Sequence, residues 1–163
     1  MLLIKKYEES MSQSWDNFVQ NSNNGTIFHY RKFLNYHISR SFNDCSLCFY
    51  YQKELICVLP AVLQERKLVS HPGASYGGLI INNSMKFSVM YEIINLLDQY
   101  CAEHQIQSLF LVSPPSIYWD NYDASLEYIF EYNQYQSKEI YISHAAKLNQ
   151  DLPFIEFIDK RKK

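Results

Sequence analysis

The sequence predicts a mixed α/β domain in which a mixed β-sheet is covered by helices on both faces. The 163 residues fit one domain, and 47% of them are hydrophobic, so the chain can bury a core. Strand-like stretches first follow one another as a meander and then alternate with helical stretches, which is typical of such sheets. The predicted order is β-α-α-β-β-β-α-β-α-β, followed by a terminal helix.

The first part of the chain is predicted to form a strand and two short helices. Hydrophobic spacing places a strand at 2–7, a helix around Trp15, Phe18 and Val19, and a second helix at 28–37. Ser12 or Ser14 can cap the first helix. The polar stretch at 20–26 separates the two helices as a loop.

The middle of the chain is rich in strand-forming residues. Strands are predicted at 45–52, 55–63 and 67–71, and residues 79–81 are again extended. Lys53-Glu54 lies between the first two strands, so we expect these strands to pair as a hairpin with a tight turn.

An amphipathic helix and a buried strand follow. The helix is predicted from hydrophobic residues at helical spacing, namely Phe87, Met90, Tyr91, Ile94, Leu97 and Cys101. Asn83 or Ser84 can cap it. The continuous apolar run of the strand at 108–112 predicts burial on both faces, at the centre of the sheet. This strand ends at Pro114-Pro115, because proline cannot donate a hydrogen bond to a neighbouring strand.

The last part of the chain adds a helix, a strand and a basic end. The predicted elements are a helix around Leu126, Ile129 and Phe130, a strand at 138–146 and a helix that begins at Asp151. Asp120 or Asp123 can cap the first of these helices. We therefore expect a single domain at 1–150 and a terminal basic helix at 151–163.

Charge and hydropathy exclude several classes of protein. The net charge is −2, with no basic stripe that would attract DNA or an anionic membrane, so no nucleic-acid partner is predicted. The N-terminus carries only a short apolar stretch before two lysines, unlike a signal peptide. No run of 18 apolar residues is present, so no transmembrane segment is predicted and a cytoplasmic location is expected.

The cysteines and histidines do not form a metal-binding pattern. Cys45 and Cys48 make one C-x-x-C, but no second ligand pair follows at a suitable spacing. They also lie in a predicted strand, where a separation of three places the side chains on opposite faces. His29 and His37 have no carboxylate or cysteine between them, so we predict no metal site.

The glycines are concentrated in one loop. Three of the four glycines of the chain lie between residues 73 and 78. Glycine permits unusual backbone angles and the close approach of another chain or ligand. This loop is therefore either a turn with special backbone geometry or the wall of a binding pocket.

Short segments along nearly the whole chain resemble the FemAB-like N-acyltransferases. The matching segments are WDNFV (15–19), NGTIFH (24–29), FLNYH (33–37), LPA (59–61), SHPGASYGGL (70–79) and PSIY (115–118). Members of this group are built of two halves with the GNAT acyltransferase fold, and they act on peptidoglycan bridges or surface-polysaccharide building blocks. The resemblance implies a GNAT-like mixed sheet, and transfer of an acyl or aminoacyl group to an amine of a sugar or cell-envelope precursor.

Two departures from the group bear on activity. A GNAT domain that binds acyl-CoA usually carries Q/R-x-x-G-x-G/A before a helix whose N-terminus holds the pyrophosphate, and residues 77–87 (GGLIINNSMKF) lack this pattern. Family members are also about twice as long, and their second half begins with a basic helix, which residues 159–163 resemble. The chain therefore looks like the N-terminal half of such an enzyme. We expect acyl-CoA or aminoacyl-tRNA to bind the other half, with no cofactor bound by this one.

The glycine-rich loop and a nearby tyrosine supply the candidate site. His71 could accept the amine proton, since imidazole titrates near neutral pH, and Tyr76 offers a hydroxyl, so these two are the candidate catalytic residues. Gly77 and Gly78 could approach an anionic group through their amides, and Tyr118 follows a strand end where ligands often bind. These three are the candidate substrate-binding residues. A loop-ordering role for His71 and a packing role for Tyr118 remain open.

The resemblance to one half of a two-domain enzyme also implies the expected partners. A half-enzyme needs a second GNAT-like domain, or a second copy of itself, and an amine acceptor. Alone, it should be a weak or inactive catalyst. The alternative is a non-catalytic binding or assembly module, because such a half exposes the apolar surface that its partner would cover.

Overall fold

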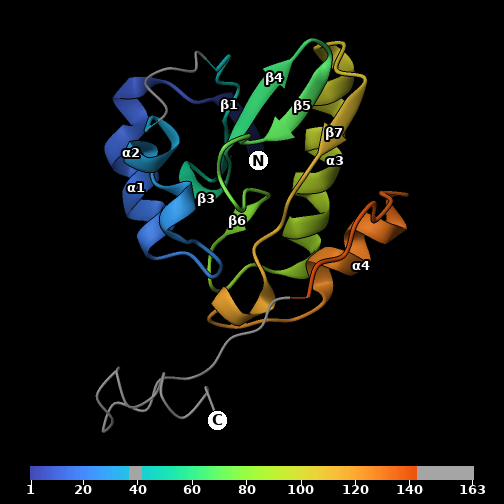
Figure 1. Ribbon diagram of the computed structural model, residues 1–163. Helices are drawn as coiled ribbons and strands as arrows, with labels where there is room; N and C mark the ends of the chain where they lie inside the picture. The colour runs from blue at the N-terminus through green and yellow to red at the C-terminus, as the bar shows by residue number, and fades with distance from the viewer. Residues whose placement is uncertain (37–41, 143–163) are drawn as a thin grey trace, which may run out of the picture.

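The computed structural model describes residues 1–36 and 42–142, whose helices and strands follow the predicted order as far as α4 (Figure 1). In chain order they are β1 (Leu2–Lys6), η1 (Glu9–Met11), α1 (Ser12–Gln20), η2 (Ile27–His29), α2 (Arg31–Leu34), β2 (Leu47–Tyr51), β3 (Glu54–Leu59), β4 (Ala61–Gln64), β5 (Lys67–Ser70), β6 (Ile80–Ile81), α3 (Phe87–Glu103), β7 (Ser108–Phe110), η3 (Ser116–Tyr118) and α4 (Ser125–Tyr132). The label η marks a short 3-10 helix.

The described strands form two sheets. One has the order β1-β2-β3-β6 and is antiparallel throughout, and the other has the order β4-β5-β7, with β5 and β7 parallel. The single strand predicted at 55–63 is divided at Pro60, which cannot donate a backbone hydrogen bond. At this point the chain passes from the first sheet to the second.

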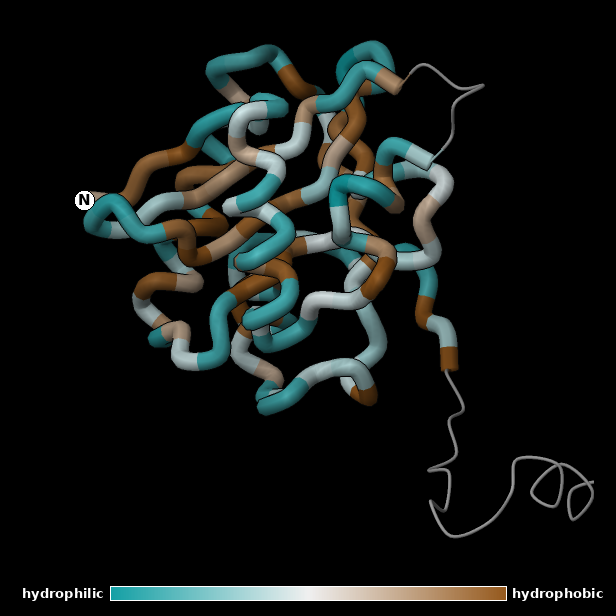
Figure 2. The backbone as a smooth tube through the Cα atoms, turned by 90° about the vertical axis from the view of Figure 1, so that its left-hand side faces the viewer, coloured by the Kyte–Doolittle hydropathy of each residue, from teal (hydrophilic) through white to brown (hydrophobic). Residues whose placement is uncertain are grey.

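Helices cover both faces of the strand layer, as predicted. Figure 1 shows α1 and α2 on one side and α3 and α4 on the other. Each side has its own core: Trp15 of α1 packs with Val58 and Ile80 of the sheet, whereas Ile94 of α3 and Ile129 of α4 belong to a larger cluster. In Figure 2 the hydrophobic stretches run mainly through the middle of the molecule. The mixed α/β class is confirmed.

The two cysteines of the C-x-x-C motif point to different cores, as their spacing predicts. Cys45 belongs to the α3–α4 side and Cys48 to the α1–α2 side. Burial raises the pKa of the Cys48 thiol to about 12, so this thiol stays protonated at neutral pH. Across residues 1–36 and 42–142, no group of histidine, cysteine and acidic residues could hold a metal ion.

The helix starts differ from the predictions. The N-cap of α1 is Met11, and Ser14 Oγ instead donates a hydrogen bond of 2.8 Å to the Met11 carbonyl. For α3 the N-cap is Lys86, so neither predicted residue, Asn83 or Ser84, caps it. In both cases no cap side chain accepts a hydrogen bond from the first turn.

The other helix predictions need smaller corrections. The helix predicted at 28–37 is divided into η2 and α2 at Tyr30, whose ψ of 140° is extended; residue 37 lies outside the described residues. α4 has Ala124 as its N-cap, and Asp123 Oδ1 accepts a hydrogen bond from the Ser125 amide. Asp123 thus accepts a hydrogen bond from the first residue of α4, although it lies one position before the N-cap residue.

The predicted hairpin is present, but its turn lies one residue earlier. β2 and β3 pair antiparallel, with Tyr51 opposite Glu54. Gln52 and Lys53 occupy the turn with φ values of 50° and 74°. Positive φ at both central residues follows the right-handed twist of the strands, so the turn forms even without glycine or asparagine.

The strand at 108–112 was predicted at the centre of a sheet, and this is wrong. β7 covers only Ser108–Phe110 and pairs with β5 alone, so it is an edge strand among the described residues. Its apolar side chains are half-buried, because α3 and α4 cover one face and no second strand of the described part covers the outer edge. A continuous run of apolar residues does not distinguish a central strand from an edge strand that helices cover on one face.

The end of the chain departs further from the prediction. The strand predicted at 138–146 is not formed over 138–142, where Ile140 and Ile142 are exposed. The rest of that strand and the helix predicted at 151–163 lie outside the described residues. None of the helices described is both long and apolar enough for a membrane span.

Candidate functional site

The loop between β5 and β6 holds four of the five predicted site residues, and close packing at Gly77 and a left-handed backbone at Gly78 account for two of its glycines. A Cβ added to Gly77 would lie 2.7 Å from the Cβ of Ser70. The Gly77 amide donates a hydrogen bond of 2.8 Å to the Val112 carbonyl, and the Val112 amide donates one of the same length to Ser70 Oγ. Gly78 has a φ of +72°, in the left-handed region that favours glycine. The loop is therefore tied to the segment that follows β7.

His71 lies at the start of this loop and is enclosed. Its side chain is only 4% exposed, and its ring packs edge-on against Phe42 with the centroids 5.1 Å apart. Its amide donates to the Pro60 carbonyl, and its own carbonyl accepts from Ala74. These contacts order the loop at the point where the two sheets separate.

Tyr76 and Tyr118 are brought together from distant parts of the chain. The ring of Tyr76 lies 5.9 Å from that of Tyr118 and 5.5 Å from that of Phe28, which in turn meets Phe33 at 5.0 Å. We call these four residues the aromatic cluster. Tyr118 is exposed and Tyr76 half-buried, so part of the cluster is open to solvent. Tyr76 contacts Phe28 and Tyr118, whereas His71 contacts Phe42, so these ring contacts do not join the two predicted catalytic residues.

His29 is a buried histidine that directly follows Phe28 of the aromatic cluster. From the sequence it was predicted to have a structural role and not to bind a metal. Its Nδ1 accepts a hydrogen bond of 2.8 Å from the Thr26 amide and so caps η2. Burial lowers the pKa of its imidazole to about 4, although the backbone groups of Gly77 and Thr26 act in the opposite direction. His29 is therefore neutral at pH 7. The NGTIFH segment contains both partners of this cap, three residues apart.

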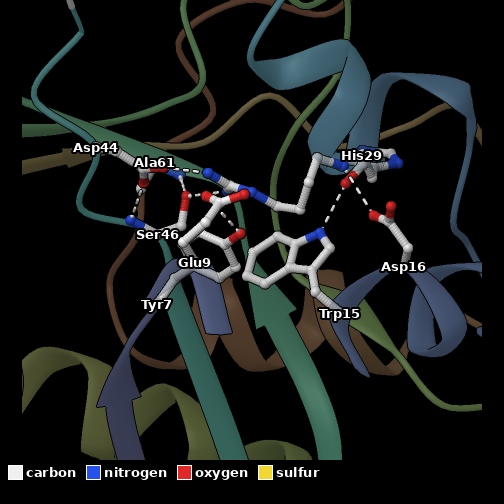
Figure 3. A network of polar contacts seen from close by, with 9 residues as sticks. Tyr7, Glu9, Trp15, Asp16, His29, Asp44, Ser46 and Ala61 are labelled. Carbon is white, nitrogen blue, oxygen red and sulfur yellow. Dashed lines mark hydrogen bonds and ion pairs between the residues drawn. The ribbon is translucent and has the colours of Figure 1, made fainter. Parts of the chain in front are cut away.

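A second, partly buried network is centred on Arg31, the first residue of α2. Arg31 is almost fully buried, forms an ion pair with Asp44 and donates a hydrogen bond of 3.2 Å to Ser46 Oγ (Figure 3). Its guanidinium lies 3.7 Å from the centroid of the Tyr7 ring and 5.1 Å from that of Trp15. Arg31 is not among the residues that the sequence marks as candidates, because a lone arginine in a short helix has no distinctive pattern.

The network around Arg31 joins elements rather than forming an open site. The Arg31 amide donates to Asp16 of α1, and Ser46 Oγ also accepts from the Ala61 amide at the start of β4. Hydrogen bonds from Ser46 and the charge of Arg31 hold the pKa of Asp44 below its ordinary value, against burial, which is the largest influence and raises it. An ion pair that has one buried partner, Arg31, and hydrogen bonds of both partners to neighbouring elements fixes the arrangement of α1, α2 and β4.

The chain enters α3 by a path held through backbone and side-chain contacts. The Asn82 amide donates to the Ile56 carbonyl, and Asn83 Nδ2 donates to the Asn21 carbonyl at 3.2 Å. No glycine lies between Asn82 and Phe87, the first residue of the helix. The first turn of α3 is therefore not preceded by a glycine loop of the kind that surrounds a pyrophosphate.

Comparisons of sequence give no relative for this chain. No model of a protein family matches it. No curated protein matches it significantly.

Comparisons of structure give several similar folds. A ribosomal-protein-alanine N-acetyltransferase from Brucella melitensis biovar Abortus 2308 is 10% identical, with 91% of this chain and 100% of that one aligned and a TM-score of 0.52. An aminoglycoside antibiotic 6'-N-acetyltransferase from Acinetobacter baumannii is 12% identical over 91% and 100%, with a TM-score of 0.51. A transcriptional regulator from Bacillus halodurans C-125 is 9% identical over 90% and 100%, with a TM-score of 0.54.

These similarities establish the class of fold. The described part of the chain has the fold of the GNAT N-acetyltransferases, with a mixed strand layer between two pairs of helices. The alignments cover nearly all of this chain and the whole of the acetyltransferases, so the likeness concerns the full arrangement and not a single motif. At such low identity the likeness carries the fold and no particular substrate.

Proposed function

We propose that this chain is an N-acyltransferase domain of the FemAB-like kind, which binds the amine acceptor and works with a second domain that holds the acyl donor. The observation that carries the proposal is the aromatic cluster beside the glycine-rich loop. Tyr76 and Tyr118 come from segments that resemble the family, and their rings lie 5.9 Å apart at the surface. Aromatic faces with hydroxyl groups at their edges suit the binding of a sugar ring.

The entry to α3 supports a separate donor site. A pyrophosphate is commonly held by free backbone amides of a glycine-rich turn at a helix N-terminus. Here the Asn82 amide is already used by Ile56, and the turn before Lys86 has no glycine. The donor, acyl-CoA or aminoacyl-tRNA, would then be bound by a second GNAT-like domain or by a second copy of this chain. On its own the domain would be weakly active or inactive.

The proposed reaction is a simple acyl transfer. The amine nitrogen of the acceptor attacks the carbonyl carbon of the donor, the new C–N bond forms, and the bond to the thiolate or the tRNA oxygen breaks. The nitrogen loses one proton and the leaving group gains one. Tyr76 would hydrogen-bond the acceptor. His71 would take the proton. Because its ring is buried, the residues around it would have to move before the acceptor could reach it.

Binding of an amino sugar tests the acceptor role. We expect glucosamine to shift the NMR signals of residues 76–78 and 116–118 in the full chain, in a saturable manner. Tyr118→Ala should weaken this binding about tenfold or more, because it removes one ring of the platform. Tyr128→Ala is the control: it changes an exposed tyrosine on α4 and should leave the binding of glucosamine unchanged. Shifts that are absent, or that persist in Tyr118→Ala, would refute the acceptor site.

A further inference from the structure

A groove lined mainly by aromatic side chains lies between α3 and α4. It has a volume of about 300 Å³ and is lined by Phe87, Tyr91, Tyr128, Ile129 and Tyr132. Phe87, Tyr128 and Tyr132 are 48%, 58% and 64% exposed, a large apolar area to leave in contact with water. We call this feature the α3–α4 groove. It lies on different elements from the aromatic cluster of the proposed acceptor site.

The aromatic rings that line the groove contact one another. Tyr128 and Tyr132 lie one helical turn apart on α4 with nearly parallel rings, 6.3 Å between centroids. Tyr91 of α3 meets Tyr132 at 5.9 Å, and Phe87, one turn earlier, meets Tyr128 at 6.0 Å. Two rows of rings at helical spacing suit the apolar side of an amphipathic segment, whose anchors recur every three or four residues.

The surroundings of the groove are acidic. The two helices carry five acidic residues and neither lysine nor arginine: Glu92, Asp98, Glu103, Glu127 and Glu131. Glu127 and Glu131 are exposed at i and i+4 on α4, a spacing at which like charges repel. Neither has an ion-pair partner within residues 1–36 and 42–142. The nearest cations in sequence are Lys86, just before α3, and Lys138, six residues after the end of α4. A basic partner segment would relieve this repulsion.

The sequence of this chain contains such a segment. Phe154, Ile155 and Ile158 recur at helical spacing, and Lys160-Arg161-Lys162-Lys163 follow directly. We propose that residues 154–163 bind in the α3–α4 groove of the same molecule, with the apolar residues against the rings and the basic residues near Glu127 and Glu131. This proposal does not depend on the proposed acyl transfer.

The connecting chain is long enough for this contact. The 11 residues from 143 to 153 join Ile142 to the proposed segment, and they can span about 35 Å when extended. The eight residues of α4 extend over only about 12 Å. Ile142 is ten residues after Tyr132 and so lies at most about 35 Å from it, which the linker can span to return the segment to that end of the groove within one molecule, at a high effective concentration.

Photo-crosslinking in the full chain tests the proposal. Benzoylphenylalanine replaces Tyr132 in the groove or, as a matched control, the exposed Tyr118 of the aromatic cluster. In monomeric protein, we expect the probe at position 132 to form crosslinks to residues 151–163 at least about tenfold more than the probe at 118. The Ile155→Ser/Ile158→Ser variant should lower this yield about tenfold, since it removes two of the three apolar anchors. Raising the ionic strength from about 0.1 M to about 1 M should lower it further, because it screens the charges.

The outcomes separate the possible occupants. Crosslinks between two copies would overturn the proposal and identify the groove as an interface between molecules. Equal yields at positions 132 and 118, or yields unchanged by the serine substitutions, would also overturn it. Thermal unfolding of each variant shows whether the described domain remains folded, so that a lost crosslink is attributed to the segment alone.

Discussion

At the scale of single residues, the structure assigns structural roles to the most buried polar groups. Arg31 is buried, stacks on the Tyr7 ring, donates a hydrogen bond to Ser46 and is paired with the half-buried Asp44, so its charge serves to join elements. His29 caps η2 and is held neutral by burial. By contrast, Tyr118 is exposed and Tyr76 half-buried at the surface of the aromatic cluster. The proposed binding role therefore falls to the tyrosines.

Burial of His29 predicts a defined loss of stability on acidification. The pKa of its imidazole is about 4 in the folded protein and 6.5 in the unfolded chain, so between these values the unfolded state binds more protons. The free energy of unfolding should therefore fall as the pH is lowered from 6.5 to 4, by about 3 kcal/mol. The Asp44 contribution is lost mainly below this range, as the pH falls from near 3.8, the value in the unfolded chain, through the lower pKa of the folded state.

Denaturant unfolding at several pH values measures this effect. His29→Gln should be less stable at pH 7, because it disturbs the cap and a fully buried site, but its stability should change much less between pH 6.5 and pH 4. His104→Gln, at the exposed end of α3, should retain the dependence of the unmodified protein. Equal slopes in the His29→Gln variant and the unmodified chain would contradict a neutral buried His29.

At the scale of elements, turns and breaks follow from backbone geometry that sequence patterns indicate only in part. The amphipathic stripe of α3 was predictable, because apolar residues that recur at helical spacing over so long a stretch fit a helix and not a strand. The caps of α1 and α3 were not, since Met11 and Lys86 are not residues that favour this position. Pro60 does give a signal for the break between β3 and β4, but the apolar residues on both sides of it favour one continuous strand.

The β2–β3 turn offers a stabilising substitution. Gln52 and Lys53 hold positive φ values, which cost free energy for side chains with a Cβ. Gln52→Asn/Lys53→Gly matches the sequence that this turn prefers and should raise the free energy of unfolding by about 1 kcal/mol. The melting temperature measures the change. Gln52→Val/Lys53→Val is the matched control and should lower it, since branched side chains tolerate these angles least; the opposite order would refute this turn geometry.

At the scale of the whole molecule, the fold class was predictable and the position of the edge strand was not. The order of strands and helices sufficed for a mixed sheet covered on both faces. The apolar run of β7 gave no information on whether a further strand lies beside it, because that depends on distant parts of the chain. For the site, concentration of glycine marked the 71–78 loop, whereas the contact of Tyr76 with Tyr118 joins segments 42 residues apart and needed the structure.

We propose that a second domain or a second copy, and not this GNAT-fold domain by itself, holds the acyl donor, and titration of acetyl-CoA into the chain tests this proposal most directly. Isothermal calorimetry should give no saturable binding up to about 1 mM, because the entry to α3 has no glycine turn and its Asn82 amide is occupied. Saturable binding to the chain alone, with a dissociation constant in the micromolar range, would contradict this claim.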